Sequence, residues 1–330
     1  MKVLDQIKDK ARALGRTVVL PEGNEERSII AAKSLTEQNI AKVILLGDID
    51  KVKSLCGQQG LDPESISIIH PESSPDFDSY VELLLERRKA KGMTKDDAVE
   101  LMKQELFFGA AMVKSGKADA SVAGAVNTTG KVLRAALYVI GLAEGINTLS
   151  SCFLMTLPKF LDTVEKVFTF ADCAVVPNPN PQQLASIAAS SADTMKKLTG
   201  EEPKVAFLSF STKGSAKHSD IDKVTEALDI FKKDYPDIEA DGELQLDAAV
   251  IPAIGQKKAP GSTVAGSANV LIFPDLDAGN IGYKLAQRMA GATATGPIIQ
   301  GLEVPANDLS RGCSADDIVD VSAIAVLLKG

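Results

Sequence analysis

Short β-branched runs alternate with longer helical stretches along the whole chain of 330 residues. The first run is TVVL at 17–20, and the stretch that follows it, PEGNEERSIIAAKSL, carries apolar residues at helical spacing with Asn24 as the expected cap. Later runs are KVILL at 42, ISII at 66, DASVAG at 119, LSSCFLMTL at 149, CAVV at 173, KVAFLSF at 204 and VLIF at 270. This alternation predicts an α/β fold in which helices cover both faces of largely parallel sheets.

The length and charge of the chain restrict its partners. A chain of 330 residues is long enough for two domains of ordinary size. Its net charge of −8 argues against nucleic acid or an anionic membrane as the main partner, because both require a basic face. A phosphate site on such a chain must therefore be a local basic pocket.

Cysteine usage and the N-terminal sequence predict a cytoplasmic protein. Four cysteines lie far apart and form no C-x-x-C pair, and the chain has only two histidines, so a zinc cluster is not expected. The first fifteen residues are amphipathic, carry both signs of charge and lack the hydrophobic core of a signal peptide. No apolar run approaches the ~18 residues of a membrane span.

The stretch NDLSRGCSADDIVD at 307–320 allows two interpretations. Ser314 and Asp317 have the spacing of a helix capping box, which would make this an ordinary helix start. That interpretation does not explain Ser310 and Arg311 on the incoming turn. A hydroxyl, a guanidinium and the positive end of a helix converge there, so the stretch could instead stabilise an anion, including one that develops in a transition state.

The segment GAVNTTGKVLRAAL at 124–137 is not a P-loop, because its glycine spacing is wrong and Val132 stands where a Mg²⁺-binding hydroxyl should be. Thr129 could simply cap a helix with Arg134 at the surface. Alternatively, Asn127, Thr128 and Thr129 form an oxyanion cradle at the start of that helix.

Two further segments carry clustered charge. ELLLERRKAKGMT at 82–94 places Arg88 in a basic run that is either a solvated helix end or a clamp for polyphosphate. In FPDLDAGNIGYKLAQRMA at 273–290, Asp275 and Asp277 could ligate a metal but are more commonly helix caps. The same helix brings three side chains within reach of one another: Tyr283, Lys284 and Arg288.

Motifs for other chemistries are missing from the sequence. No G-x-G-x-x-G follows a predicted strand, no G-x-S-x-G elbow is present, and two histidines leave little for a Ser-His-Asp triad. The side chains available for catalysis are therefore Arg, Lys, Ser and Asp.

Six segments together resemble the phosphate acetyltransferase (phosphotransacetylase) family over essentially the whole chain: VVLPEGNEER, KGMT, SFSTKGSAKHS, DGELQLDAAVIPAIGQKKAP, NVLIFPDLDAGNIGYKLAQR and GPIIQGLEVPANDLSRGCSADDI. The resemblance implies two α/β domains with largely parallel sheets around a cleft, an architecture related to the isocitrate and isopropylmalate dehydrogenases. We place domain I at 1–147 plus 298–330 and domain II at 148–297, mainly on this resemblance. It also implies a homodimer, no tightly bound cofactor, no metal, and CoA and acetyl-CoA as substrates.

The family's reaction joins acetyl-CoA and phosphate to give acetyl phosphate and CoA, reversibly and without a covalent enzyme intermediate. The resemblance places the catalytic serine and arginine on Ser310 and Arg311 and the general base on Asp317. Arg311 and Ser310 would then stabilise the oxyanion while Asp317 takes the proton of the CoA thiol.

The resemblance places the arginines that bind CoA and phosphate on Arg88, Arg134 and Arg288. The phosphoryl group would be held by four other side chains, which are Thr128, Thr129, Tyr283 and Lys284. The sequence departs from the family in two places. Ala90 replaces a histidine in many relatives, and TTGKVLRA differs from the usual acidic spacer before Arg134.

Three other functions stay open at this point. A phosphate butyryltransferase would differ mainly in the volume of its acyl pocket. A metal-dependent dehydrogenase of the related architecture would use Asp275 and Asp277 as ligands. A catalytically silent module that regulates a partner is the third alternative, although Ser310, Arg311 and Asp317 are all present.

Overall fold

The computed structural model describes residues 2–329, which divide into two compact units. The terminal unit comprises 2–144 and 302–329, and the middle unit comprises 145–301. Residues 298–300 pair with a strand of the middle unit, and the chain enters the terminal unit at Leu302. The middle unit begins at Gly145.

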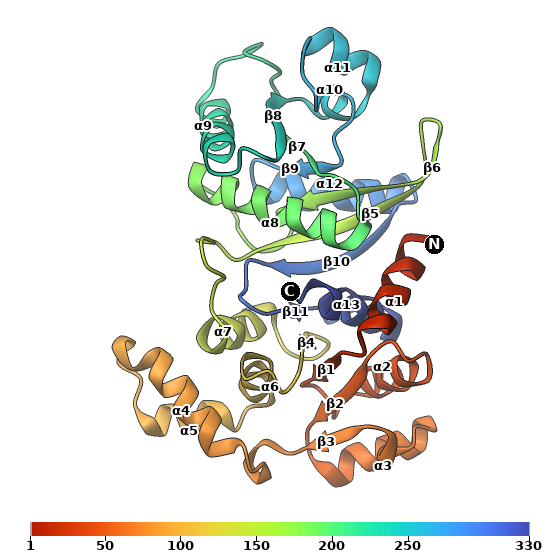
Figure 1. Cartoon of the computed structure of the whole chain (residues 1–330), viewed down its shortest axis with the longest axis vertical. Coiled ribbons are helices and arrows are strands. Elements are labelled where there is room, and N and C mark those ends of the chain that lie inside the picture. Colours follow the sequence, from red (N-terminus) through yellow and green to blue (C-terminus); the bar gives the residue numbers. More distant parts are fainter. Residues whose placement is uncertain (1, 330) are drawn as a thin grey trace. The chain divides into compact units, whose positions relative to one another are not determined.

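The terminal unit is built on a five-stranded parallel sheet of order β11-β4-β1-β2-β3 (Figure 1). Its strands are β1 Thr17–Leu20, β2 Lys42–Leu46, β3 Ser67–Ile69, β4 Ala120–Ala123 and β11 Ala306–Asp308. Its helices are α1 Lys2–Leu14, α2 Glu26–Glu37, α3 Ile49–Gln59, α4 Phe77–Arg88, α5 Lys95–Met102, α6 Glu105–Lys114, α7 Thr129–Val139 and α13 Ala315–Leu328. The β-branched runs at 17, 42, 66 and 119 therefore form strands β1 to β4, as the sequence predicts.

Two nearly all-apolar helices sandwich this sheet. α13 packs on β4, α1 and α2, and α6 packs on β4 and β1 and also on α4 and α7. α6 is buried from Leu106 to Val113, which explains why its sequence shows no polar face. The core on the α6 side includes Phe107, Phe108 and Leu84. This packing fixes the strands whose ends carry the candidate site.

The middle unit has a six-stranded mixed sheet of order β10-β5-β6-β9-β7-β8. Its strands are β5 Ser150–Phe160, β6 Thr163–Ala171, β7 Lys204–Leu208, β8 Glu239–Leu244, β9 Val270–Ile272 and β10 Thr293–Gln300. β5 is antiparallel to β6 and β10, and the remaining pairs are parallel. The α/β class predicted from the sequence is confirmed.

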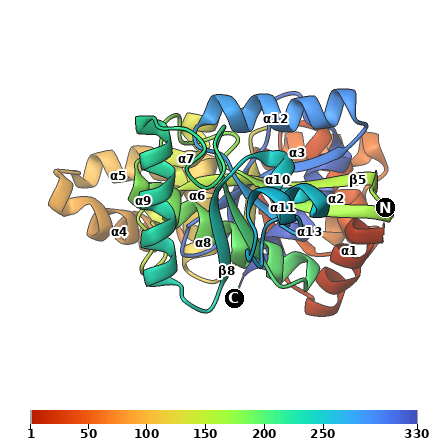
Figure 2. The same cartoon turned by 90° about the horizontal axis from the view of Figure 1, so that it is seen from above.

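The helices of the middle unit are α8 Pro181–Thr199, α9 Ser219–Asp234, α10 Leu246–Val250, α11 Pro252–Lys258 and α12 Leu276–Met289. Figure 2 shows α12 and α8 on opposite faces of the sheet, and both helices pack against β5 and β6. α8 is the more deeply buried helix, and only one residue of α12, Gly279, is fully buried. No helix within 2–329 is long and apolar enough to cross a membrane.

Several local predictions are wrong for identifiable reasons. The strand expected at CAVV is a turn, because its N–H groups at Ala174, Val175 and Val176 bind the carboxylate of Asp172. Asn24 does not cap α2, whose N-cap residue is Glu25. Elsewhere, α5 and α6 are separated at residues 103–104, and α10 ends before α11 because proline at residue 252 cannot continue the hydrogen bonding of α10.

Candidate active site

The ends of three neighbouring strands bring separate segments of the terminal unit together. β11, β4 and β1 are adjacent and parallel, so their carboxyl ends lie at one edge of the sheet. Residues 21–27 follow β1, residues 124–128 follow β4, and residues 309–314 follow β11. Ligands of parallel sheets bind at such an edge. Two predicted site segments, Ser310–Arg311 and Thr128–Thr129, therefore belong to the same edge.

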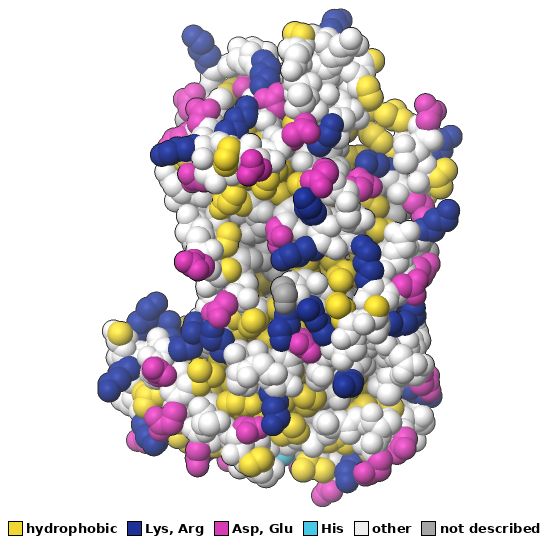
Figure 3. Space-filling model, viewed as in Figure 1, with side chains coloured by type: hydrophobic (Ala, Val, Ile, Leu, Met, Phe, Trp, Pro, Cys, Tyr) yellow, Lys and Arg dark blue, Asp and Glu magenta, His cyan; other side chains and the backbone are white. Residues whose placement is uncertain are grey.

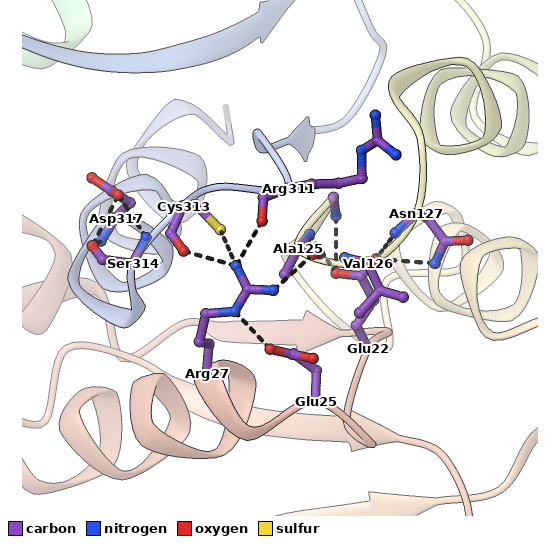
Figure 4. Close-up of polar contacts among 11 residues, drawn as sticks. Glu22, Glu25, Arg27, Ala125, Val126, Asn127, Arg311, Cys313, Ser314 and Asp317 are labelled. Atoms are coloured by element: carbon purple, nitrogen blue, oxygen red, sulfur yellow. Dashed lines mark hydrogen bonds and ion pairs between the residues drawn. The ribbon is translucent and has the colours of Figure 1, made fainter.

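The backbone of the loop after β4 already binds a carboxylate from within the chain. Glu22 is buried, and its carboxylate accepts hydrogen bonds from the N–H groups of residues 124, 125, 126 and 127 at 3.0, 2.7, 3.1 and 2.8 Å. The amide of Asn127 adds a further bond at 2.9 Å (Figure 4). The Asn127 part of the predicted oxyanion cradle is therefore wrong, because an internal anion satisfies those donors.

The start of α7 remains available to an anion. Thr128 is the N-cap residue, and within the described chain its side chain makes no capping bond, so Thr129 is not the cap. Thr129 is the first residue of the helix, and the first N–H groups of any helix have no partner within it. The Thr129 side chain forms a hydrogen bond with Asp308, so the Thr128 hydroxyl and the first N–H groups of α7 are the donors open to an anion.

Ser310 and Arg311 form an exposed turn between β11 and α13. The Ser310 hydroxyl accepts a hydrogen bond from the Gly312 N–H at 3.3 Å, and the Ser310 carbonyl accepts one from Cys313 N–H at 2.8 Å. Figure 4 shows the Arg311 side chain extending toward the side on which Asn127 lies, away from the first turn of α13. The Arg311 guanidinium therefore lies on the same side of the loop as Asn127.

Asp317 forms the capping box that the sequence predicts. Its Oδ2 accepts hydrogen bonds from the Ser314 N–H at 2.8 Å and from the Ser314 hydroxyl at 2.9 Å, and its own N–H donates to that hydroxyl at 3.1 Å. Figure 4 shows Asp317 and the Arg311 guanidinium on opposite sides of the loop. The structure therefore does not bring these two predicted catalytic side chains together, and the cap bonds engage only one of the two carboxylate oxygens of Asp317.

A buried acid that the sequence analysis missed ends β11 just before this turn. Asp308 is only 2% exposed, and its Oδ1 has no hydrogen-bond partner among residues 2–329. Burial raises the pKa of Asp308 to about 6, an effect that the Glu22 charge increases and a hydrogen bond with Thr129 reduces. The backbone of the next residue, Leu309, lies so close to Gly124 that any side chain at position 124 would collide with the Leu309 backbone. No local sequence signal separates Asp308 from an ordinary polar residue of a turn.

Replacing Asp308 with asparagine is expected to stabilise the protein at high pH. Because the pKa is raised in the folded state, stability associated with the neutral form is fully present below about pH 4 and is lost as the pH rises through about 6. The loss amounts to about 3 kcal/mol at pH 8 at most. Urea unfolding from pH 4 to pH 8 should show Asp308→Asn gaining on the wild type from about pH 4 upward, with little further gain above about pH 6.

Asp119→Asn is the matched control for this experiment and should show the opposite trend. Burial raises the pKa of Asp119, but its bonds with Lys329 and with the Thr17 N–H outweigh burial and hold it below the ordinary value. That carboxylate therefore stabilises the fold at neutral pH and loses its effect as the pH falls. A stability difference between Asp308→Asn and the wild type that does not change with pH would show that Asp308 ionises normally.

The basic run at the end of α4 contains one structural arginine and one that faces a pocket. Arg87 donates to the Ile140 carbonyl at 2.5 Å. The Arg88 guanidinium lies 3.8 Å from the centre of the Tyr138 ring, beside a pocket of about 350 Å³ that Lys91 and Met93 also line. The Nε of Arg88 is buried without a partner in the described chain. Figure 3 shows Lys and Arg side chains gathered on the lobe that α4 and α5 form.

Arg88 and Arg134 share one aromatic support. Arg134 lies 5.6 Å from the centre of the Phe107 ring, and Phe107 packs edge to face with Tyr138, the ring under Arg88. Both guanidinium groups thus lie on aromatic faces in cation–π contact. The structure therefore brings two of the three predicted anion-binding arginines to one cluster of the terminal unit.

The third predicted arginine belongs to α12 of the middle unit. Tyr283 stacks on Phe153 with ring centres 4.2 Å apart, and burial raises its pKa. Lys284 is exposed, with its Nζ donating to Asn280 Oδ1 at 2.8 Å, and Arg288 is close enough to Tyr283 to oppose the rise in its pKa. Tyr283, Lys284 and Arg288 therefore form one group on α12, as the helical spacing predicts.

The acids at the start of α12 have a structural role. Asp275 is the N-cap residue and accepts a hydrogen bond from Ala278 N–H at 2.8 Å. Within residues 2–329, no three His, Cys, Asp or Glu side chains are grouped as a metal site requires. The residues present favour the capping interpretation of Asp275 over a metal ligand.

The Ser310–Arg311 turn, the start of α7 and the buried Asp308 lie at one edge of the parallel sheet, where ligands of such sheets bind. The chain belongs to a family of acyl-group transferases: the sequence model described as "Phosphate acetyl/butaryl transferase" matches residues 2–326. The resemblance inferred from the sequence motifs is confirmed by this match.

Individual relatives agree over nearly the full length. A phosphate acetyltransferase of Thermoanaerobacterium thermosaccharolyticum is 50% identical over 323 residues, covering 98% of both chains. The crystal structure of a phosphotransacetylase from Streptococcus pyogenes is 42% identical with a TM-score of 0.93, covering 99% of this chain and 97% of that one. A Salmonella typhimurium structure described as a 4-hydroxythreonine-4-phosphate dehydrogenase is 13% identical with a TM-score of 0.54, which shows a likeness of fold alone and agrees with the expected dehydrogenase-like architecture.

Proposed function

We propose that the chain catalyses reversible transfer of an acetyl group between CoA and inorganic phosphate, so that acetyl-CoA and phosphate give acetyl phosphate and CoA. The observation that carries this proposal is the exposed Ser310–Arg311 turn at the end of β11, on the edge where α7 begins, in a chain of the acetyl/butyryl transferase family. The turn supplies a hydroxyl and a guanidinium where acyl transfer develops an oxyanion.

The transfer proceeds directly between the two substrates. The CoA sulfur attacks the carbonyl carbon of acetyl phosphate, and the thiol proton passes to Asp317 as the C–S bond forms. This step requires the Arg311 side chain to turn toward Asp317 when the substrates bind. The tetrahedral oxyanion is held by Arg311 and Ser310, and collapse breaks the C–O bond so that phosphate leaves. Holding both substrates together removes much of the entropic barrier. No group on the enzyme becomes covalently modified.

Binding of the substrates is assigned to the remaining predicted residues. Arg88 and Arg134 suit the phosphates of CoA, because their guanidinium groups are held on Tyr138 and Phe107 and a guanidinium can form forked bonds with a phosphate. For the phosphoryl group of acetyl phosphate we propose Thr128 and Thr129 of the terminal unit. On the middle unit we propose that Tyr283, Lys284 and Arg288 also bind substrate. CoA is a substrate in this scheme and no cofactor is retained.

Release of free thiol from acetyl-CoA, followed with and without phosphate, tests the activity. We expect release that requires phosphate and yields one acetyl phosphate for each thiol. Release without phosphate would indicate a thioesterase, and Mg²⁺-dependent NAD reduction would indicate the dehydrogenase alternative. The same assay with butyryl-CoA decides between acetyl and butyryl transfer, and we expect acetyl-CoA to have the higher kcat/KM.

An exposed apolar row on α12 supports the proposed homodimer. Ile281, Leu285 and Met289 are 56, 50 and 81% exposed and recur at a spacing of four, so they share one face of the helix. Leu285→Glu should lower the molar mass measured by light scattering from two chains to one. Leu246→Glu, at an exposed leucine of α10, is the control and should leave the mass unchanged.

We propose a cytoplasmic location because all four thiols are free and buried.

A further inference from the structure

The segment between β1 and α2 carries charges that the proposed transfer does not use. Glu22 fills the loop after β4, as described above. Arg27 lies in the first turn of α2 and has a partly exposed side chain. Arg27 lies beside the loops after β4 and β11, and its side chain binds the backbone of both loops.

The Arg27 guanidinium joins three segments of the terminal unit. Its Nη1 donates to the carbonyls of Arg311 and Cys313 at 2.9 and 2.8 Å. Its Nη2 donates to the Ala125 carbonyl at 2.8 Å, and its Nε pairs with Glu25 at 2.6 Å (Figure 4). The planar fork of an arginine can make these bonds at the same time, whereas an ammonium group cannot.

These bonds set the direction of the catalytic turn. The Arg311 carbonyl faces Arg27 while the Arg311 side chain extends to the other side of the loop (Figure 4). Gly312, between the two bound carbonyls, has little packing of its own: a Cβ there would meet only the Ser310 hydroxyl oxygen, at 3.8 Å. Order in the turn therefore depends on Arg27 more than on side-chain packing. The hydrogen bond with Glu25 raises the pKa of Arg27, so the guanidinium stays charged.

We propose that Arg27 is a positioning residue for the acyl transfer, holding the backbone of residues 311–313 against residue 125 so that Ser310 and Arg311 face the reacting carbonyl. The proposal rests on the proposed function for its kinetic consequence, but the anchoring of the turn can be measured without it. Arg27 touches no substrate in this scheme, and its effect passes through the turn that it fixes.

Arg27→Ala and Arg27→Lys test the proposal. We expect kcat to fall about 10- to 100-fold, because displacement of a reacting group by about 1 Å can have an effect of that size. KM for CoA should stay within about threefold, since Arg88 and Arg134 are untouched. Guanidinium chloride at millimolar concentration should restore part of the kcat of Arg27→Ala by occupying the space of the lost group. Arg27→Lys keeps the charge and provides a second test if the alanine variant fails to fold.

Arg16→Ala is the matched control. Arg16 also donates from Nη1 to backbone carbonyls, those of Val326 and Lys329, at the end of α13 that is remote from the turn. We expect its kcat to equal that of the wild type even if stability falls. A kcat for Arg27→Lys equal to that of Arg16→Ala, or a loss in Arg27→Ala that guanidinium does not restore, would overturn the proposal.

Amide hydrogen exchange separates this inference from the proposed function. Exchange of the amides of residues 311–314 should be at least tenfold faster in Arg27→Lys than in the wild type, with no such change in Arg16→Ala. Unchanged exchange in Arg27→Lys overturns the anchoring role whether or not the enzyme transfers acetyl groups. A wild-type protein without phosphate-dependent thiol release, but with faster exchange in Arg27→Lys, would overturn the proposed function and its kinetic part while retaining the anchor.

Discussion

Arg311→Lys is expected to lower kcat about 10²- to 10³-fold while the protein remains folded. The guanidinium lies on an exposed turn, so the substitution removes little packing. Lysine keeps the positive charge but loses the planar pair of donors, which matches a developing oxyanion better than a point charge does. Loss of one such donor typically lowers the rate by that factor. Steady-state turnover of acetyl phosphate and CoA measures the effect.

The control for this substitution is Arg12→Lys. Arg12 lies on α1, where its Nε donates to the Gln38 carbonyl, and the exchange of arginine for lysine at that position should leave kcat unchanged. Thermal unfolding of both variants should stay close to that of the wild type. A kcat within threefold of the wild type for Arg311→Lys would remove Arg311 from the reaction and leave the turn as a connection to the cap of α13.

Interactions within a few residues were predictable from the sequence. The Ser314–Asp317 capping box and the equivalent box at Thr94–Asp97 follow from spacing alone, because each pairs a hydroxyl with a carboxylate three residues later. The strands of the parallel sheet were likewise predictable, since their β-branched runs are bounded by polar turns. In each of these cases the local preference and the tertiary structure agree.

Interactions between distant segments were not predictable in this way. Glu22 binds N–H groups about a hundred positions further along the chain, and Arg27 binds carbonyls more than two hundred and eighty positions away. Asp308 gains its raised pKa only because the fold buries it beside Glu22. The family resemblance identified the exposed residues that substrates would contact. The side chains that hold those residues in place can be identified only from the structure, in which the three strand ends are adjacent.

Asp317 is proposed as the catalytic base and also caps α13, and two substitutions separate these roles. As a base it accepts the thiol proton, so Asp317→Asn should lower kcat about 10²- to 10⁴-fold. As a cap it binds Ser314, and an asparagine oxygen can still accept a hydrogen bond from the Ser314 N–H, so stability should fall by no more than about 1 kcal/mol. Steady-state kinetics and urea unfolding of the same preparation give both values.

Ser314→Ala removes the hydroxyl that caps α13 but leaves the Asp317 carboxylate. It should therefore cost about 1 kcal/mol of stability, as other N-cap serines do, while kcat stays near that of the wild type. If Asp317→Asn instead retains wild-type kcat, Asp317 serves only the helix, and the proton acceptor must be another group at this edge of the sheet.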